Sequence, residues 1–176
     1  MIILFWMITV LSVVIDRITK YIAESGISEG QLIRAITLGD TDILAFSLHK
    51  NTGAAFSSFT GKTMALAIVT AIAMVLITVY FHKQKHKHPL LTVSFGLIVG
   101  GGIGNFIDRV FQGYVTDFIR LFPFNFIFNF ADICVVFGAI LLIVFYLFIE
   151  GKYMKQFEEE KSNDCLLYTS PSPRDG

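Results

Sequence analysis

Asp117 and Asp132 are the two residues whose type and spacing most directly suggest chemistry, since they lie fifteen positions apart and bracket a short segment between two apolar runs. Two carboxyl groups a few ångströms apart in a low dielectric cannot both ionise easily, so such a pair keeps one proton. The ionised member can deprotonate a water molecule while the protonated member polarises a carbonyl group, which is a route to amide hydrolysis. The alternative is that the carboxylates are unrelated and that one of them caps the following helix.

Asp16 and Lys20 are four positions apart in an otherwise apolar run, which puts both on one face of a helix. An ionisable side chain near the centre of a membrane helix costs about 2.5–3.5 kcal/mol, and less near its ends. Two interpretations remain open from the sequence. One is an ion pair at the membrane boundary with the Lys20 ammonium reaching toward water, and the other is that both groups face a polar cavity.

Four apolar runs must position these residues, and each is long enough to cross a bilayer as a helix. They cover about 2–22, 64–81, 90–107 and 133–149. Of the 176 residues, 54% are hydrophobic and 16% are charged, and this charged fraction is well below the roughly 25% of soluble domains. We therefore predict an all-α membrane protein with four transmembrane helices and a small extracytoplasmic β-containing segment.

The composition also excludes other classes of protein. The 14 basic and 14 acidic residues give a net charge of zero, so no excess of positive charge is present to neutralise a nucleic acid. The apolar content excludes an intrinsically disordered chain, and two cysteines are too few for a disulfide scaffold.

The basic residues predict the orientation of the chain. Lys83, Lys85 and Lys87 lie in the short segment 82–89, and the positive-inside rule places that segment and both termini in the cytoplasm. Segments 23–63 and 108–132 then face outward. Three histidines in segment 82–89 could suggest a metal site, but no cysteine or carboxylate accompanies them, and a basic topogenic loop is the favoured interpretation.

The outward segment 23–63 carries a strand signal. Leu44, Phe46 and Leu48 alternate with smaller or polar residues, which is typical of a half-buried strand, and the range 51–53 then has the composition of a turn.

The third apolar run contains a stripe of glycines at Gly96, Gly100 and Gly104. A spacing of four residues places them on one helix face, where the absence of side chains lets a neighbouring helix approach closely. We interpret the stripe as a packing device.

The end of the chain changes character. Residues 1–155 are predicted to form a single integral membrane domain, and 156–164 a charged cytoplasmic tail. Residues 165–176 carry prolines and no helical period, and we expect them to be a sequence artefact that has no part in function.

Five short blocks together resemble the bacterial prolipoprotein signal peptidases, also called type II signal peptidases. They occur in family order and cover roughly residues 1–155. They are Asp16–Lys20 (DRITK), Asn51–Phe56 (NTGAAF), Gly101–Arg109 (GGIGNFIDR), Val115–Ile119 (VTDFI) and Phe128–Asp132 (FNFAD).

The resemblance implies a membrane-embedded aspartic endopeptidase that cleaves diacylglyceryl-modified prolipoproteins just before the lipidated Cys. It implies that Asp117 and Asp132 are the catalytic pair and that the enzyme uses no metal and no organic cofactor. It also implies a multi-pass protein of the bacterial plasma membrane, in contact with membrane lipids and with its active site on the extracytoplasmic side, and we expect a monomer. The positions that match residues lining or shaping the site are Asp16, Lys20, Asn51, Gly53, Asn105, Arg109, Asn129 and Ala131.

Within this frame, Asn105 and Arg109 are expected to hold either the substrate backbone or the loop that carries the aspartates, because Arg109 offers a rigid fork of donors. Asp108 is a poorer candidate and is expected to take part in a structural ion pair. The chain departs from the family pattern at one position, where it has Ile133 and the family often has Ser. The missing hydroxyl group removes a local hydrogen bond at the start of the helix and leaves the catalytic pair unchanged.

Two other functions compete with this interpretation. A small proton- or cation-coupled transporter could use Asp16, Asp117 and Asp132 as a relay, although it would favour carboxylates near mid-membrane and an inverted repeat. A membrane scaffold could use the glycine stripe and the aromatic residues for packing alone, but it leaves the polar cluster without a role.

Overall fold

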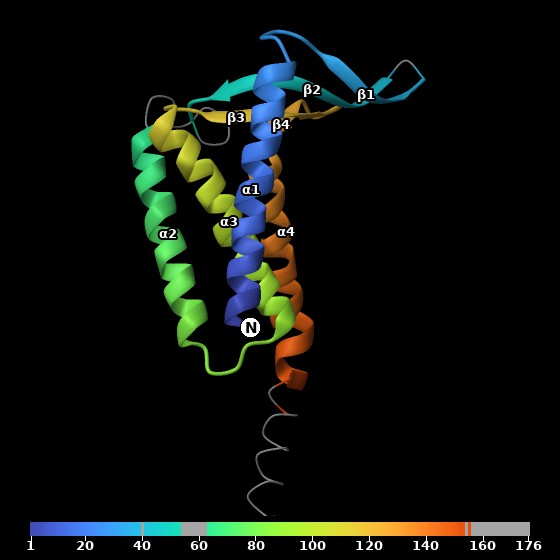
Figure 1. Cartoon of the computed structure of the whole chain (residues 1–176). Coiled ribbons are helices and arrows are strands. Elements are labelled where there is room, and N and C mark those ends of the chain that lie inside the picture. Colours follow the sequence, from blue (N-terminus) through green and yellow to red (C-terminus); the bar gives the residue numbers. More distant parts are fainter. Residues whose placement is uncertain (40, 54–62, 154, 156–176) are drawn as a thin grey trace, which may run out of the picture.

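The computed structural model describes residues 1–39, 41–53, 63–153 and 155, and these form a helical bundle with a small sheet across one end (Figure 1). The helices are α1 (Ile2–Gly26), α2 (Thr63–Lys83), α3 (Pro89–Phe111) and α4 (Phe130–Val144), and α4 continues into the π-helical turn η2 (Phe145–Ile149). The predicted segments 156–164 and 165–176 lie outside the described residues.

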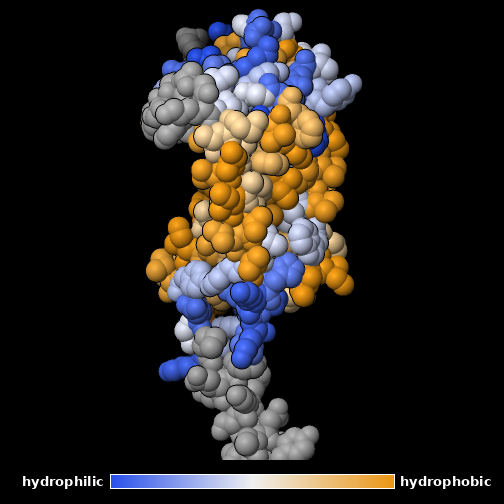
Figure 2. Space-filling view, turned by 90° about the vertical axis from the view of Figure 1, so that its left-hand side faces the viewer, coloured by the Kyte–Doolittle hydropathy of each residue, from blue (hydrophilic) through white to orange (hydrophobic). Residues whose placement is uncertain are grey.

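Helices α1, α2 and α3 are each long and apolar enough to cross a membrane, and so is the stretch Phe130–Tyr153, which comprises α4 and its continuation. Figure 2 shows a continuous hydrophobic band around the middle of the visible face, with hydrophilic residues gathered at both ends. The helices extend past the apolar runs of the sequence: α1 ends at Gly26 and α3 at Phe111, each about four residues later, and α4 begins at Phe130 rather than near residue 133. The first turn of α4 contains the charged Asp132 and follows the N-cap Asn129, so the uninterrupted apolar run begins only at Ile133.

Helix α3 is the centre of the bundle. It packs against α1, α2 and α4, and 61% of its most apolar window is buried inside the protein, against 11% for α2. At the end of the bundle away from the sheet, Phe5 of α1 stacks on Phe81 of α2 with ring centroids 4.4 Å apart. Phe95 and Val99 of α3 belong to the same apolar cluster.

The glycine stripe lets α1 lie directly on α3, which confirms the packing interpretation. A Cβ atom at Gly100 would lie 2.7 Å from the Cβ atom of Ser12, and one at Gly104 would lie 2.6 Å from a carboxylate oxygen of Asp16. Real Cβ atoms do not approach other atoms so closely. Glycine at these positions therefore sets the distance between the two helices that carry most of the buried charge.

The sheet is antiparallel, with strand order β1-β2-β3-β4. Its strands are β1 (Ile33–Leu38), β2 (Thr41–Asn51), β3 (Val115–Leu121) and β4 (Phe126–Phe128). The strand predicted around Leu44–Leu48 is part of β2. The sequence pattern did not predict β3 and β4, which lie in the outward segment 108–132.

The register of β2 against β3 brings one end of β2 to the first predicted catalytic residue. Asp117 pairs with His49, and Asn51 pairs with Val115 two residues away. The register shifts between Phe46 and His49, which marks an irregularity in the pairing of the two strands. Such an irregularity re-aims the side chains that follow it.

Replacing Gly100 by valine tests the role of the stripe. The added side chain has no room against Ser12 and the Thr9 carbonyl, so we expect the free energy of unfolding in detergent to fall by about 1–3 kcal/mol. Gly151→Ala is the control, because a Cβ atom there meets nothing within 4 Å. Equal thermal unfolding of Gly100→Val and wild type would contradict the close approach of α1 and α3.

Candidate active site

Asn129 joins the two predicted catalytic aspartates. Its side-chain amide donates to Oδ1 of Asp117 over 2.6 Å, and its backbone N–H donates to Oδ2 of Asp132 over 3.2 Å. Asp117 comes from β3 and Asp132 from the first turn of α4. Both carboxyl groups therefore meet at one residue, and the hydrogen bonds of the described residues include none that joins the carboxyl groups directly.

The same two residues start helix α4. Asn129 is the N-cap, and its side-chain oxygen accepts the backbone N–H of Asp132 over 3.0 Å while Asp132 accepts the N–H of Asn129. This capping box satisfies donors that the first helical turn would otherwise leave unpaired. The capping box also fixes the orientation of the Asp132 carboxylate. The alternative that one of the two aspartates caps the following helix therefore describes part of what Asp132 does.

Asn105 supports the pair from helix α3. Its amide nitrogen donates to Oδ1 of Asp132 over 2.7 Å, and its oxygen accepts from Asn129 over 3.1 Å and from the Lys20 ammonium over 3.0 Å. Both polar atoms of this side chain are therefore committed to residues of the site. The geometry gives Asn105 the second of its two expected roles, which is to hold the loop that carries the aspartates.

Asn51, at the end of β2, reaches the other side of Asp117. Its amide nitrogen donates to Oδ2 of Asp117 over 3.0 Å, and its oxygen accepts the backbone N–H of Gly53 over 3.0 Å. The second contact is the turn expected at residues 51–53. Both carboxylate oxygens of Asp117 thus accept a hydrogen bond from a side-chain amide.

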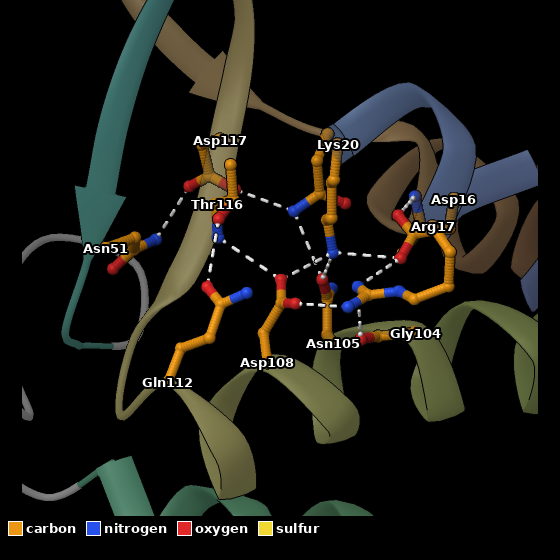
Figure 3. A network of polar contacts seen from close by, with 12 residues as sticks. Asp16, Arg17, Lys20, Asn51, Gly104, Asn105, Asp108, Gln112, Thr116 and Asp117 are labelled. Carbon is orange, nitrogen blue, oxygen red and sulfur yellow. Dashed lines mark hydrogen bonds and ion pairs between the residues drawn. The ribbon is translucent and has the colours of Figure 1, made fainter. Parts of the chain in front are cut away.

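A cluster of four charged residues lies beside the pair, where α1 meets α3 (Figure 3). We call it the buried ion cluster, and it consists of Asp16, Arg17, Lys20 and Asp108. The Lys20 ammonium lies 3.0 Å from Asp16 and 2.7 Å from Asp108. Lys20 is only 2% exposed, so its ammonium does not reach toward water. The ion pair between Asp16 and Lys20 is present, but it is buried inside the protein beside Asp108.

Arg17 is the half-buried member of the buried ion cluster, and sequence reasoning missed it. Its guanidinium lies 2.6 Å from Asp108 and 2.7 Å from Asp16, and it also donates to the Gly104 carbonyl over 3.0 Å. The sequence did carry a signal for Arg17, because it is a third charged residue in the same apolar run as Asp16 and Lys20. Asp108 forms the structural ion pairs expected of it, with Arg17 and Lys20 of α1.

The two acids of the buried ion cluster hold the backbone next to each aspartate of the pair. Asp16 accepts the N–H of Ala131, the residue before Asp132, over 3.1 Å. Asp108 accepts the N–H of Thr116, the residue before Asp117, over 3.2 Å. The cluster is therefore attached to both catalytic candidates through one backbone bond each.

Arg109 of α3 lies near the pair without an ion pair to it among the described residues. It interacts electrostatically with Asp132, Asp117 and Asp108. The structure thus brings Arg109 to the site but does not commit its guanidinium to either aspartate. This differs from Arg17, whose donors are used within the buried ion cluster.

Asp117 has an unusual acidity. Burial raises the pKa of its carboxyl group to about 6, and the negative charge of Asp132 also raises it. The amide donors of Asn51 and Asn129 and the positive charge of Lys20 act in the opposite direction. Asp117 therefore keeps its proton up to a pH well above the ordinary range of an aspartate.

The described residues contain no group of three His, Cys, Asp or Glu side chains that could hold a metal ion. Of the histidines in segment 82–89, His88 has a structural use. Its Nδ1 atom accepts the backbone N–H of Leu90 and caps helix α3.

The chain is similar to known proteins over most of its length. The family described as signal peptidase (SPase) II matches residues 8–148. A lipoprotein signal peptidase of Clostridium novyi (strain NT) is 38% identical over 150 residues, which is 83% of this chain and 98% of that protein.

Two solved structures, each described as a bacterial membrane enzyme studied by the in meso method, share this fold. Both are 34% identical to this chain, with TM-scores of 0.72 and 0.71. The superpositions cover 80% and 81% of this chain and 85% and 92% of the solved chains.

Replacing Asp108 by asparagine tests the buried ion cluster. The substitution keeps the shape of the side chain but leaves Lys20 and Arg17 with a single acid between them. Because an uncompensated buried charge is costly, we expect the free energy of unfolding in detergent to fall by about 3–5 kcal/mol. The control is Asp42→Asn, which breaks a surface pair with Arg34 and should cost less than about 1 kcal/mol. Similar losses in the two variants would refute the special role of Asp108.

Replacing Asn51 by alanine tests the electrostatics of Asp117. The variant loses a hydrogen bond that favours the ionised carboxylate, so the pKa of Asp117 should rise above about 6. Asp132→Asn removes a neighbouring negative charge, so it should lower the pKa of Asp117. Infrared titration of the protonated carboxyl band, assigned by its loss in Asp117→Asn, measures both shifts. Shifts of the same sign in the two variants would contradict this account.

Proposed function

The chain belongs to the signal peptidase II family, and we propose that it is a membrane-embedded aspartic endopeptidase that removes the signal peptide from diacylglyceryl-modified bacterial prolipoproteins. The family makes it a bacterial membrane protease, and its match favours a peptidase over a transporter or scaffold. The observation that carries the aspartic mechanism is that Asp117 and Asp132, from separate elements, are both hydrogen-bonded to Asn129.

The pair performs general acid–base hydrolysis. The two carboxyl groups share one proton, because neighbouring carboxylates cannot both ionise easily, and burial and the charge of Asp132 raise the pKa of Asp117 to about 6. The ionised member of the pair accepts a proton from the attacking water, while the protonated member donates to the oxygen of the scissile carbonyl. When the tetrahedral intermediate collapses, the C–N bond breaks and a proton passes to the leaving nitrogen. The products are a carboxylic acid and the free amine of the lipidated cysteine.

The other candidate residues divide into two roles. Arg109 binds the substrate backbone, since its guanidinium makes no hydrogen bond or ion pair with the described residues and a guanidinium binds carbonyl oxygens through a planar fork. The remaining residues position the pair, through side-chain amides, a turn, or the buried ion cluster. These positioning residues are Asp16, Lys20, Asn51, Gly53, Asn105, Asn129 and Ala131.

The site faces the extracytoplasmic side in this proposal. Both the N-terminus and segment 82–89 lie at the end of the bundle opposite the sheet (Figure 1). Lys83, Lys85 and Lys87 in that segment mark the cytoplasmic end by the positive-inside rule. The sheet and the aspartate pair then lie at the outer membrane boundary, with residues 1–155 acting as one monomeric peptidase domain.

Asp117→Asn and Asp132→Asn test the mechanism, because each removes only the ability to ionise. We expect each variant to cleave a diacylglyceryl-modified peptide about 10²–10⁴-fold more slowly than wild type. The rate is measured by mass spectrometry of the released fragments with purified protein in detergent.

Asp42→Asn serves as the control, since Asp42 lies on the β1–β2 hairpin and pairs only with Arg34 among the ion pairs described. Its cleavage rate should equal that of wild type. Full activity of either aspartate variant, in protein that remains folded and membrane-inserted, would rule out the proposed pair.

A further inference from the structure

An apolar pocket with a volume of about 470 Å³ opens directly beside Asp132, between the sheet and the start of α4. This volume falls in the range of ligand-binding cavities. We call it the α4 pocket. Its lining residues are Leu121, Phe126, Ile127, Phe128, Asp132, Ile133, Val136 and Phe137.

The α4 pocket is continuous with the catalytic pair along strand β3. Side chains two residues apart on a strand point to the same face, so Asp117, Ile119 and Leu121 share one face of β3. Ile119 pairs with Phe128 and Leu121 pairs with Phe126, which brings these phenylalanines to the same face. A molecule seated in the pocket therefore extends along the surface that carries Asp117.

A second apolar pocket, of about 320 Å³, lies between the sheet and the end of α1. Its lining from the sheet includes Phe118 of β3, which follows Asp117 directly, and Phe46 of β2, which pairs with Ile119. It does not contain either aspartate. Of these two apolar pockets, the α4 pocket is the one lined by a member of the aspartate pair.

The α4 pocket is open toward the lipid. Ile133, Val136 and Phe137 are 41%, 58% and 55% exposed in the protein. They lie on a helix that is apolar enough to span the membrane, so their exposed surfaces face hydrocarbon rather than water. An apolar chain can therefore move from the bilayer into the pocket without crossing water.

The chemistry of the lining selects the kind of occupant. Apart from Asp132, the side chains of the α4 pocket are apolar, and a buried peptide backbone needs hydrogen-bond partners that they do not offer. A hydrocarbon chain needs none. We propose that the α4 pocket binds one acyl chain of the diacylglyceryl group of the substrate, an inference that rests on the proposed function.

Occupation of the α4 pocket fixes where the bond to be cleaved lies. The acyl chain is joined through glycerol to the cysteine side chain, and the scissile bond is that cysteine's own amide. Anchoring one chain beside Asp132 thus places this amide at the aspartate pair, which gives the proximity that the water attack requires. The pocket acts as a specificity determinant that distinguishes lipidated from unlipidated precursors.

Val136→Trp tests the inference by filling the pocket from an exposed position. The substrates are two otherwise identical diacylglyceryl peptides, one with palmitoyl chains and one with butyryl chains that are too short to fill the pocket. We expect kcat/KM for the palmitoyl substrate to fall about tenfold, while kcat/KM for the butyryl substrate stays within about twofold of wild type.

Ile140→Trp is the matched control, because Ile140 is on the same helix, is 49% exposed and does not line the pocket. Ile22→Trp is a second control, since it fills the pocket beside α1. Both should leave the palmitoyl-to-butyryl ratio unchanged. A Val136→Trp protein that loses activity equally on both substrates, or on neither, overturns the acyl-chain assignment while the proposed function stands.

A binding measurement supports the test if Val136→Trp is poorly folded. A substrate with a photoreactive diazirine on one acyl chain is bound to the otherwise unaltered Asp132→Asn protein and irradiated. Labelling of residues 133–137 is the expected result, and labelling confined to the α1 pocket residues or spread evenly over the bundle overturns the assignment. If wild-type protein cleaves neither substrate, the proposed function itself fails, and the inference fails with it.

Discussion

The structure depends on one electrostatic constraint: four charges are buried or half-buried where α1 crosses the sheet-side half of α3, and they are stable there only because they neutralise one another. Two acids and two bases, Asp16, Asp108, Arg17 and Lys20, make four ion pairs of 2.6–3.0 Å. A single unpaired charge in that position would cost several kcal/mol. The pairs form only because glycines on α3 let α1 approach. The close packing of the two helices and the burial of their charges therefore depend on each other.

The buried ion cluster does more than hold two helices together. Each of its acids also accepts a backbone N–H, at Ala131 and at Thr116, directly before the two candidate catalytic aspartates. Lys20 adds a third connection through Asn105, which in turn donates to Asp132. A strand and a helix from separate parts of the fold are thereby positioned by the same charges, which give the aspartate pair a rigid base.

The sheet supplies what the helices cannot. It carries Asp117, brings Asn51 to that carboxylate and takes part in the burial that raises its pKa to about 6. Its opposite end covers an apolar pocket over α4. One small element therefore combines a polar environment for proton transfer with an apolar surface for a lipid, and the boundary between them is a single strand on which Asp117, Ile119 and Leu121 follow one another at alternate positions.

The sequence by itself determined the parts of this protein that depend on local pattern: four apolar spans, the glycine stripe, the strand around residues 44–48, and the family blocks that point to Asp117 and Asp132. Hydropathy and spacing are properties of neighbouring residues, so they can be recognised without coordinates. The tertiary structure alone decided that Asn129 joins the two aspartates, that Arg17 belongs to the buried ion cluster and that Asp108 pairs with α1. It also decided that β3 and β4 complete the sheet. These contacts join residues far apart in the chain, and their partners are chosen by packing distance and by the need to neutralise buried charge, neither of which a local pattern encodes.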